Sequence, residues 1–191
     1  MEKIKSILVT LVSLATIVGI AYGGIRTSPD SLEKWLTTHY AAKEKVTQLH
    51  FYVRDVISTP TPTNVVVASA NTTSSSPTSF GQVAVMDDPV TVGPEPGSKI
   101  IGQAGGIYAL ASLEETSLHM TFTIVFADGE YNGSTLSFSG HNAYLTPLRQ
   151  ISIVGGTGVF AFARGVTSVT TLSSNSSGDA VFQYDSIVLH Y

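Results

Sequence analysis

The chain has 191 residues with a formal net charge of −4 at pH 7, and only 13% of its residues are charged. This composition excludes the broad basic surface that nucleic-acid binding requires, and the lack of cysteine in the sequence excludes disulfide bonds and thiolate chemistry. A chain of this length fits one domain with an adequate core. We therefore expect a neutral or apolar partner, and a fold stabilised by its core or by oligomerisation.

Residues 1–23 are typical of a secretory signal peptide. Lys3 and Lys5 precede an apolar run from Ile7 to Ala21, and small residues follow where a signal peptidase would cut, near Gly23. The alternative is a membrane anchor, which needs about 18 to 20 apolar residues, whereas this run is shorter and contains serine and threonine. We expect a secreted protein with no membrane attachment after processing.

Sequons for N-glycosylation support secretion. They lie in segments rich in Ser, Thr and Gly that we expect to be turns, where an acceptor asparagine is accessible. The predicted glycosylation sites are Asn71, Asn132 and Asn175.

Residues 24–47 predict a short helix or a loose N-terminal arm ahead of the main domain. Ser28 or Asp30 can cap a helix. The apolar residues that would share one face of it are Leu32, Trp35, Leu36 and Tyr40. We expect this segment, including Trp35, to cover an apolar surface; the alternative is an amphipathic segment that binds a partner.

From residue 48 to the C-terminus strand signals repeat, with few competing helical patterns. The expected strands are Leu49–Ile57, Asn64–Ala70, Gly81–Met86, Lys99–Leu110, Ser117–Phe126, Ser134–Ser139, Gln150–Val154, Val159–Leu172 and Asp179–His190. Two Pro-rich segments, 59–63 and 93–97, lack donors for a central strand and should be loops. About eight usable strands predict an all-β barrel or sandwich over residues 48–191, and a barrel can enclose one small ligand.

The segment Ile153–Gly165 places glycines and Arg164 among residues that otherwise read as a buried strand. A phosphate-binding loop would need a further glycine at its own spacing and a helix after it. The residues that follow are rich in Val, Thr and Phe instead. We predict a loop or a β-bulge between strands.

Few side chains are candidates for chemistry. The histidines lack metal-ligand spacing, and no Gly-X-Ser-X-Gly elbow is present, so neither a zinc site nor a serine hydrolase is expected. Asp55 lies in a strand-like run, where burial would raise its pKa and make it a proton donor; the alternative is an ion pair with Arg54 or exposure to water. Arg149 can bind a phenolate, a carboxylate or Asp55, and Arg164 suits a structural salt bridge. Tyr108, Asn142 and Tyr144 can form hydrogen bonds with a substrate.

Several motifs in order resemble the plant dirigent family from about Gln48 to Tyr191. They are His50–Val56, Phe80–Gly81, Met86–Thr91, Gly102–Tyr108, Gly133–Leu136 and Ile153–Gly165. The resemblance implies an eight-stranded antiparallel β-barrel, assembled as a homotrimer, secreted to the apoplast and free of cofactors and metals.

The family contains two activities, and the resemblance implies one of them. Lignan-guiding members bind phenoxy radicals made by a separate oxidase, a laccase or peroxidase, and fix the faces that couple. The pterocarpan-synthase branch removes water from an isoflavanol through a quinone methide, and ring closure follows. By position, the resemblance assigns Asp55 as the acid, Arg149 as its catalytic partner, and Tyr108 and Phe182 as residues that bind the substrate.

Departures from the family pattern leave three alternatives. Asn142 stands where lignan-guiding members carry a second acid and can hold a hydroxyl but not transfer a proton. The missing cysteines and the segment Glu130–Leu136 are closer to the pterocarpan-synthase branch, yet Arg54 replaces a histidine common there. The leading hypothesis is stereoselective phenoxy-radical coupling or quinone-methide cyclisation with Asp55 as the acid. The alternatives are an isoflavanol dehydratase and a non-catalytic protein that binds phenolics or organises the cell wall.

Overall fold

The computed structural model describes residues 33–35, 37–38 and 41–191. The predicted signal peptide lies outside the described residues, as do the helix positions Leu32, Leu36 and Tyr40. Within the predicted arm of residues 24–47, residues 33–35 and 37–38 are helical, whereas residues 45–47 already belong to the first strand. The chain divides into a unit of residues 1–42 and a unit of residues 43–191, which holds the strands.

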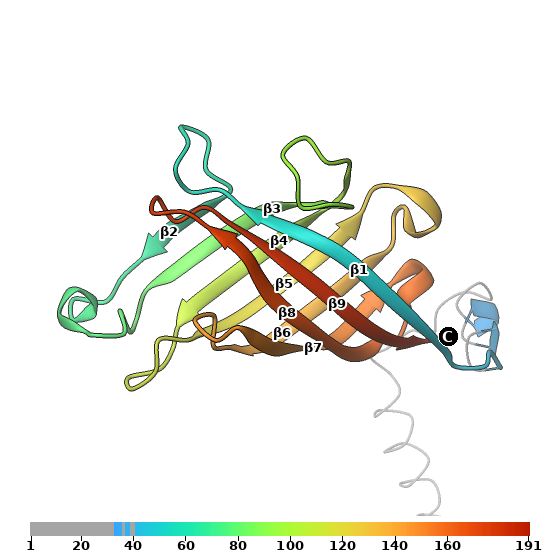
Figure 1. Ribbon diagram of the computed structural model, residues 1–191. Coiled ribbons are helices and arrows are strands. Elements are labelled where there is room, and N and C mark those ends of the chain that lie inside the picture. Colours follow the sequence, from blue (N-terminus) through green and yellow to red (C-terminus); the bar gives the residue numbers. More distant parts are fainter. Residues whose placement is uncertain (1–32, 36, 39–40) are drawn as a thin grey trace, which may run out of the picture. The chain divides into compact units, whose positions relative to one another are not determined.

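The larger unit is a closed antiparallel β-barrel (Figure 1). Its strands are β1 Lys45–Asp55, β2 Asn64–Ala68, β3 Val83–Thr91, β4 Ile100–Leu110, β5 Leu118–Phe126, β6 Thr135–Asn142, β7 Leu148–Thr157, β8 Arg164–Ser174 and β9 Ala180–His190. The order β1-β9-β8-β7-β6-β5-β4-β3 closes where β1 pairs with β3, and β2 adds to β3 alongside. The eight-stranded barrel is thus confirmed, and β2 is an additional strand at its rim.

Alternation of side chains gives the wall its two faces. On β5, Met120, Phe122, Ile124 and Phe126 are buried in the interior, and the residues between them face outward. An aromatic layer fills the middle of the barrel, where Phe122 stacks on Phe138 with ring centroids 4.7 Å apart and Tyr184 meets both edge-on. These rings belong to the buried core of the barrel.

Several expected strand ends differ from the observed ones, and two of the largest differences have a clear structural cause. The strand expected to stop at Met86 continues through Pro89 to Thr91. Pro89 has no N–H to donate, but it lies between the β2–β3 pairing, which ends at Met86, and the β1–β3 pairing, which begins at Val90, so the strand tolerates it there. The strand expected from Val159 begins only at Arg164. In its place a 3₁₀ turn, η3 Gly158–Phe160, inserts the fully buried Phe160 into the barrel end against Phe126 and Tyr131.

Both alternatives predicted for this segment occur: the first glycines form a bulge in β7, and residues 158–163 form the loop that connects β7 to β8. Gly155 and Gly156 belong to β7, and the register with β6 shifts where Gly155 faces Ser137 and Ile153 faces Phe138. The glycine segment therefore continues the wall and bends it.

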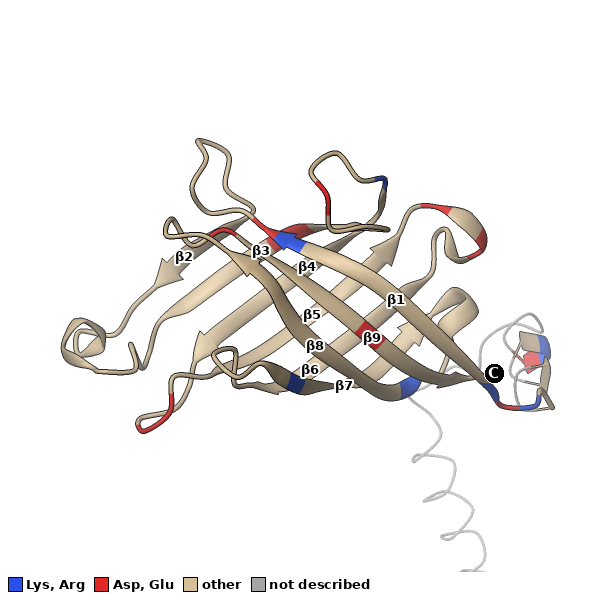
Figure 2. Ribbon diagram, in the orientation of Figure 1, with Lys and Arg blue, Asp and Glu red and all other residues tan. Residues whose placement is uncertain are grey.

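Two further 3₁₀ turns, η1 Thr73–Ser75 and η2 Gly129–Tyr131, occur in loops. No helical segment in the described part of the chain has the length and hydropathy needed to cross a membrane. Strands β4, β5 and β6 contain no Asp, Glu, Lys or Arg. Most charges lie in loops and near strand ends (Figure 2), and the exceptions are Asp87 and Asp88 within β3 and Asp185 within β9. A charged side chain in the barrel interior is therefore an exception to this distribution.

Candidate active site

A cavity of about 360 Å³ opens at the end of the barrel where β1 stops and β9 starts. A volume of this size accepts one small molecule. Its apolar walls include Met86, Leu110, Leu118, Met120, Leu145 and Phe182. All five residues predicted to bind or transform a substrate line it: Asp55, Tyr108, Asn142, Arg149 and Phe182.

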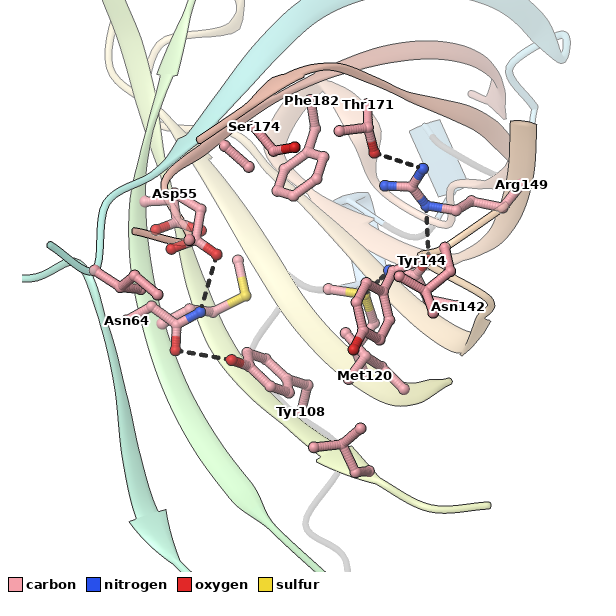
Figure 3. Close-up of a pocket in the computed structure, with 18 of the residues that line it drawn as sticks. Asp55, Asn64, Tyr108, Met120, Asn142, Tyr144, Arg149, Thr171, Ser174 and Phe182 are labelled. Carbon is pink, nitrogen blue, oxygen red and sulfur yellow. Dashed lines mark hydrogen bonds between the residues drawn. The ribbon is translucent and has the colours of Figure 1, made fainter. Parts of the chain in front are cut away.

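One side of the cavity carries a chain of hydrogen bonds from β4 through β2 to β1. The hydroxyl of Tyr108 donates to Asn64 Oδ1 at 3.0 Å, and Asn64 Nδ2 donates to Asp55 Oδ2 at 3.1 Å (Figure 3). Burial raises the pKa of Tyr108, so its hydroxyl remains the donor. Asn64 was not predicted as a site residue, although it opens a predicted strand, because only the fold brings it between Asp55 and Tyr108.

Asp55 has one carboxylate oxygen, Oδ1, that is buried without a hydrogen-bond partner in the described structure. Burial raises the pKa of Asp55, the bond from Asn64 lowers it in part, and the charge of Asp179 raises it further. The alternative of an ion pair with Arg54 is wrong. The Arg54 side chain donates instead to the carbonyl oxygen of Pro94 at 2.6 Å and does not line the cavity.

Asp88 is a second carboxyl in the cavity, and the sequence interpretation missed it. It is only 2% exposed and receives a hydrogen bond from Thr63 Oγ1 to its Oδ1 at 2.6 Å. Burial raises the pKa of Asp88 to about 8, with contributions from the charges of Asp55 and Asp87. Its alternation with Met86 and Val90 would have indicated an inward position had the strand been extended through Pro89.

The opposite side of the cavity carries Arg149, which is 6% exposed. Its Nε donates to Asn142 Oδ1 at 2.8 Å and its Nη1 donates to Thr171 Oγ1 at 3.0 Å, while its guanidinium lies 5.4 Å from the centre of the Phe182 ring. Burial lowers the pKa of Arg149, yet a guanidinium stays charged in proteins. These partners are neutral, so the positive charge is available to an anionic oxygen of a ligand.

The two polar clusters face one another across the cavity (Figure 3). We call them the acid side (Asp55, Asn64, Asp88 and Tyr108) and the arginine side (Asn142, Arg149 and Thr171). Tyr184 also lines the cavity; its side chain is buried, and burial raises its pKa. The arrangement can protonate a hydroxyl at one end of an aromatic molecule and stabilise an oxygen anion at the other.

The remaining predicted residues have these positions. Arg164 forms an exposed ion pair with Glu44, as its structural interpretation predicted, and Tyr144 lines the cavity. The side chains of Asn71, Asn132 and Asn175 are exposed. Among the residues that the structure describes, no cluster of His, Cys, Asp or Glu could hold a metal ion.

Comparisons with known proteins agree on one family. A family model described as Dirigent-like protein matches residues 46–189. Pterocarpan synthase 1 of Glycyrrhiza echinata is 48% identical over 151 residues, which cover 78% of this chain and 80% of that protein. Dirigent protein 21 of Arabidopsis thaliana is 46% identical over 148 residues, covering 77% and 78%. A solved structure of the pterocarpan synthase dirigent protein GePTS1 is similar with a TM-score of 0.72 and 47% identity, covering 79% of this chain and 88% of that one.

Proposed function

The chain belongs to the dirigent family, and from this we propose that it removes water from a benzylic alcohol of a plant phenolic, such as an isoflavanol, and directs the closure of the resulting quinone methide. The observation that carries the proposal is the acid side of the cavity. Asp88 has its pKa raised to about 8, so at neutral pH it holds a proton in an apolar pocket, as a general acid must.

The first step breaks the benzylic C–O bond. A carboxyl of the Asp55–Asp88 pair donates its proton to the hydroxyl, which leaves as water, while electrons move in from a phenolate oxygen on the same ring and generate a neutral quinone methide. We assign the donation to the pair, because coupled carboxyls titrate together and both residues line the cavity.

Arg149 stabilises that phenolate from the opposite side. Its guanidinium has neutral partners, Asn142 and Thr171, so an anionic phenol oxygen would supply the missing charge. The Phe182 ring beside it gives an aromatic substrate a surface to pack against.

The second step closes the ring. A second phenol hydroxyl attacks the benzylic carbon, its proton returns to the carboxylate left by the first step, and the first phenolate is restored. The proton balance closes over both steps without an oxidant. The cavity fixes which face is attacked because the two sides hold the two ends of the substrate.

Arg54 does not weigh against this activity. In this chain the residue at position 54 points away from the cavity toward Pro94. A histidine at that position would share the same outward face of β1, so its replacement removes no group from the acid side.

A coupling guide is the second candidate, because the chain belongs to the dirigent family and the cavity offers an aromatic molecule the surface formed by Arg149 and Phe182. A guide that only orients phenoxy radicals needs the surface formed by Arg149 and Phe182 but no proton donor. The two candidates therefore differ in their dependence on the acid side.

The test is chiral chromatography of products from two reactions. Isoflavanols are incubated with the protein alone, and coniferyl alcohol is incubated with the protein and a laccase. Conversion of an isoflavanol without the oxidase, lost in Asp88→Asn, supports the dehydratase. Enantiomeric excess only in the laccase reaction, unaffected by Asp88→Asn and lost in Arg149→Leu, supports the guide and overturns our proposal.

We also propose that the mature protein is a secreted, glycosylated homotrimer without a cofactor. The exposed sequon asparagines and the family membership support this. A sedimentation mass of one subunit would contradict the trimer.

A further inference from the structure

The loop of residues 56–63 joins β1 to β2 and holds together much of the acid side. Asp55 immediately precedes the loop, Thr63 ends it, and Asn64 follows. Its base is closed by the bonds from Thr63 N to Val56 O at 2.7 Å and from Val56 N to Thr63 Oγ1 at 3.0 Å. The conformation of this loop therefore sets the positions of Asp55, of its partner Asn64 and of the Thr63 hydroxyl that donates to Asp88.

Asp179, in the turn between β8 and β9, holds the loop from outside the cavity. Its Oδ1 accepts hydrogen bonds from the backbone N–H groups of Ile57 and Ser58, both at 2.9 Å, and its Oδ2 accepts one from Ser58 Oγ at 2.6 Å. Asn175 Nδ2 donates to the same Oδ2 at 3.0 Å. These bonds hold the pKa of Asp179 well below its usual range, so it remains an anion. We call this group of four residues the Asp179 clasp.

The clasp also shapes the rim of the cavity. Gly178 has a positive φ of 93°, and a Cβ built on it would overlap the side chain of Ile57. Both residues line the cavity, whereas Asp179 does not. The Ile57 side chain therefore packs against the backbone of Gly178, and the Ile57 N–H donates to the neighbouring Asp179.

We propose that Asp179 is a positioning residue for the acid side of the cavity. By holding Ile57 and Ser58 against the β8–β9 turn, it keeps the loop of residues 56–63 closed, and the closed loop keeps Asp55, Thr63 and Asn64 in their places. The expected effect of Asp179 on catalysis rests on the proposed function, whereas its expected effect on the closed conformation of the loop does not.

Two substitutions separate the shape of the clasp from its charge. Asp179→Ala removes every acceptor of the clasp. Asp179→Asn removes the charge but keeps an oxygen that can accept from Ile57 and Ser58. Asp185→Asn is the matched control, because Asp185 is also exposed and accepts hydrogen bonds, from His50 and Gln183, on the outer face of the barrel.

The direct test is hydrogen exchange of the loop in the full mature protein. Loss of hydrogen bonds to a charged acceptor should speed exchange at Ile57 and Ser58 by about tenfold in Asp179→Ala. A smaller effect is expected in Asp179→Asn, and none in Asp185→Asn. Unchanged exchange in Asp179→Ala overturns the proposal.

The kinetic test measures kcat, KM and the pH profile with an isoflavanol. We expect kcat to fall about tenfold in Asp179→Ala, with partial rescue in Asp179→Asn. The titratable groups that interact with Asp55 are Asp88, Tyr108, Asp179 and Tyr184. Removal of the Asp179 charge should move the Asp55 limb of the profile to lower pH in both variants. Faster exchange with unchanged kcat and pH profile would mean a merely structural clasp and would overturn the positioning role.

Failure of the proposed function remains distinguishable from failure of the clasp. If the wild-type protein converts no isoflavanol, the proposed function fails. The clasp is then judged by hydrogen exchange and by the affinity for an isoflavan, which lacks the benzylic hydroxyl. Weaker isoflavan binding in Asp179→Ala than in Asp185→Asn, together with faster exchange, supports the clasp; equal binding overturns it.

Discussion

Asp88 shows how burial, assisted by a neighbouring like charge, keeps a carboxyl group protonated at neutral pH. It lies on the inner face of β3 among apolar residues, and one hydrogen bond from Thr63 does not offset the loss of water. The nearby Asp55 adds a like charge, which further disfavours ionisation. The protein therefore carries a proton donor at neutral pH without a histidine in the cavity.

The first prediction concerns the rate. Because the pKa of Asp88 is raised to about 8, dehydration by the wild-type protein should decline as the pH rises through about 8. Asp88→Asn keeps an acceptor for Thr63 but has no proton to donate, and we expect kcat to fall by about 10²- to 10⁴-fold. A pH series of kcat/KM for both proteins is the measurement. An unchanged rate in Asp88→Asn would remove this residue from the mechanism.

The same shift predicts the pH dependence of stability. The pKa of Asp88 is raised from 3.8 to about 8 on folding, so between these values the folded protein holds a proton that the unfolded chain releases. The contribution of Asp88 to the free energy of unfolding is therefore complete below about pH 4 and is lost as the pH rises toward 8. Urea unfolding should show a smaller decline over this range in Asp88→Asn, and equal declines would contradict the buried, protonated state.

The positions of Asp55, Tyr108, Asn142, Arg149 and Phe182 at the cavity were predicted because each matches a position of the family pattern, and Asp55 also lies in a strand-like run. Asp88 was not predicted, since the strand was expected to end at Met86, and neither was the role of Asn64. A residue that bridges two others is defined by tertiary distance, and no spacing along the chain encodes that distance.

At the scale of elements, two strand glycines offer a matched comparison. A Cβ at Gly165 would overlap the carbonyl oxygen of Ile187 on the paired strand β9, whereas a Cβ at Gly155 meets nothing within 4 Å. We expect Gly165→Ala to lower the free energy of unfolding by about 1–3 kcal/mol and Gly155→Ala to change it by less than about 0.5 kcal/mol. Urea unfolding measures both, and equal effects would show that the pairing of β8 and β9 tolerates the methyl group.

In the turn between β8 and β9, the sequon residue Asn175 also forms structural hydrogen bonds, so a substitution that removes this sequon needs a control. Asn175 Oδ1 accepts hydrogen bonds from the N–H groups of Ser177 at 2.9 Å and Asp179 at 3.0 Å. Asn175→Gln should therefore lower the free energy of unfolding by about 1 kcal/mol, glycan or not. Ser177→Ala abolishes the sequon and leaves these bonds.

Mass spectrometry and urea unfolding of the two variants test this. If the site is occupied, both variants lose the same glycan mass, but only Asn175→Gln should lose stability when each is compared after enzymatic deglycosylation. Equal stability of the two deglycosylated variants would show that the turn does not depend on Asn175.

At the scale of the whole molecule, alternation and turn residues predicted an all-β domain, and the family motifs predicted a barrel rather than a sandwich. The local sequence pattern does not indicate that the sheet closes into a barrel. Closure depends on the pairing of β1 with β3 at Val53 and Val90, which are far apart in the sequence. Local signals also misplaced the end of β3 and the start of β8, because the pairing of Val90 and Thr91 with β1 extends β3 and the buried contact of Phe160 with Phe126 precedes β8.

The last prediction concerns which part of the chain is sufficient. Every residue that lines the cavity lies between Asp55 and Tyr184, and the first barrel strand begins at Lys45. A chain that starts at Lys43 should therefore keep the unfolding midpoint and the activity of the mature protein. A chain that starts at Val53 lacks most of β1, which pairs with β9 along its whole length, and should not fold. Circular dichroism and turnover of both chains are the measurements; loss of activity in the Lys43 chain with its fold intact would assign a role in the reaction to the residues before it.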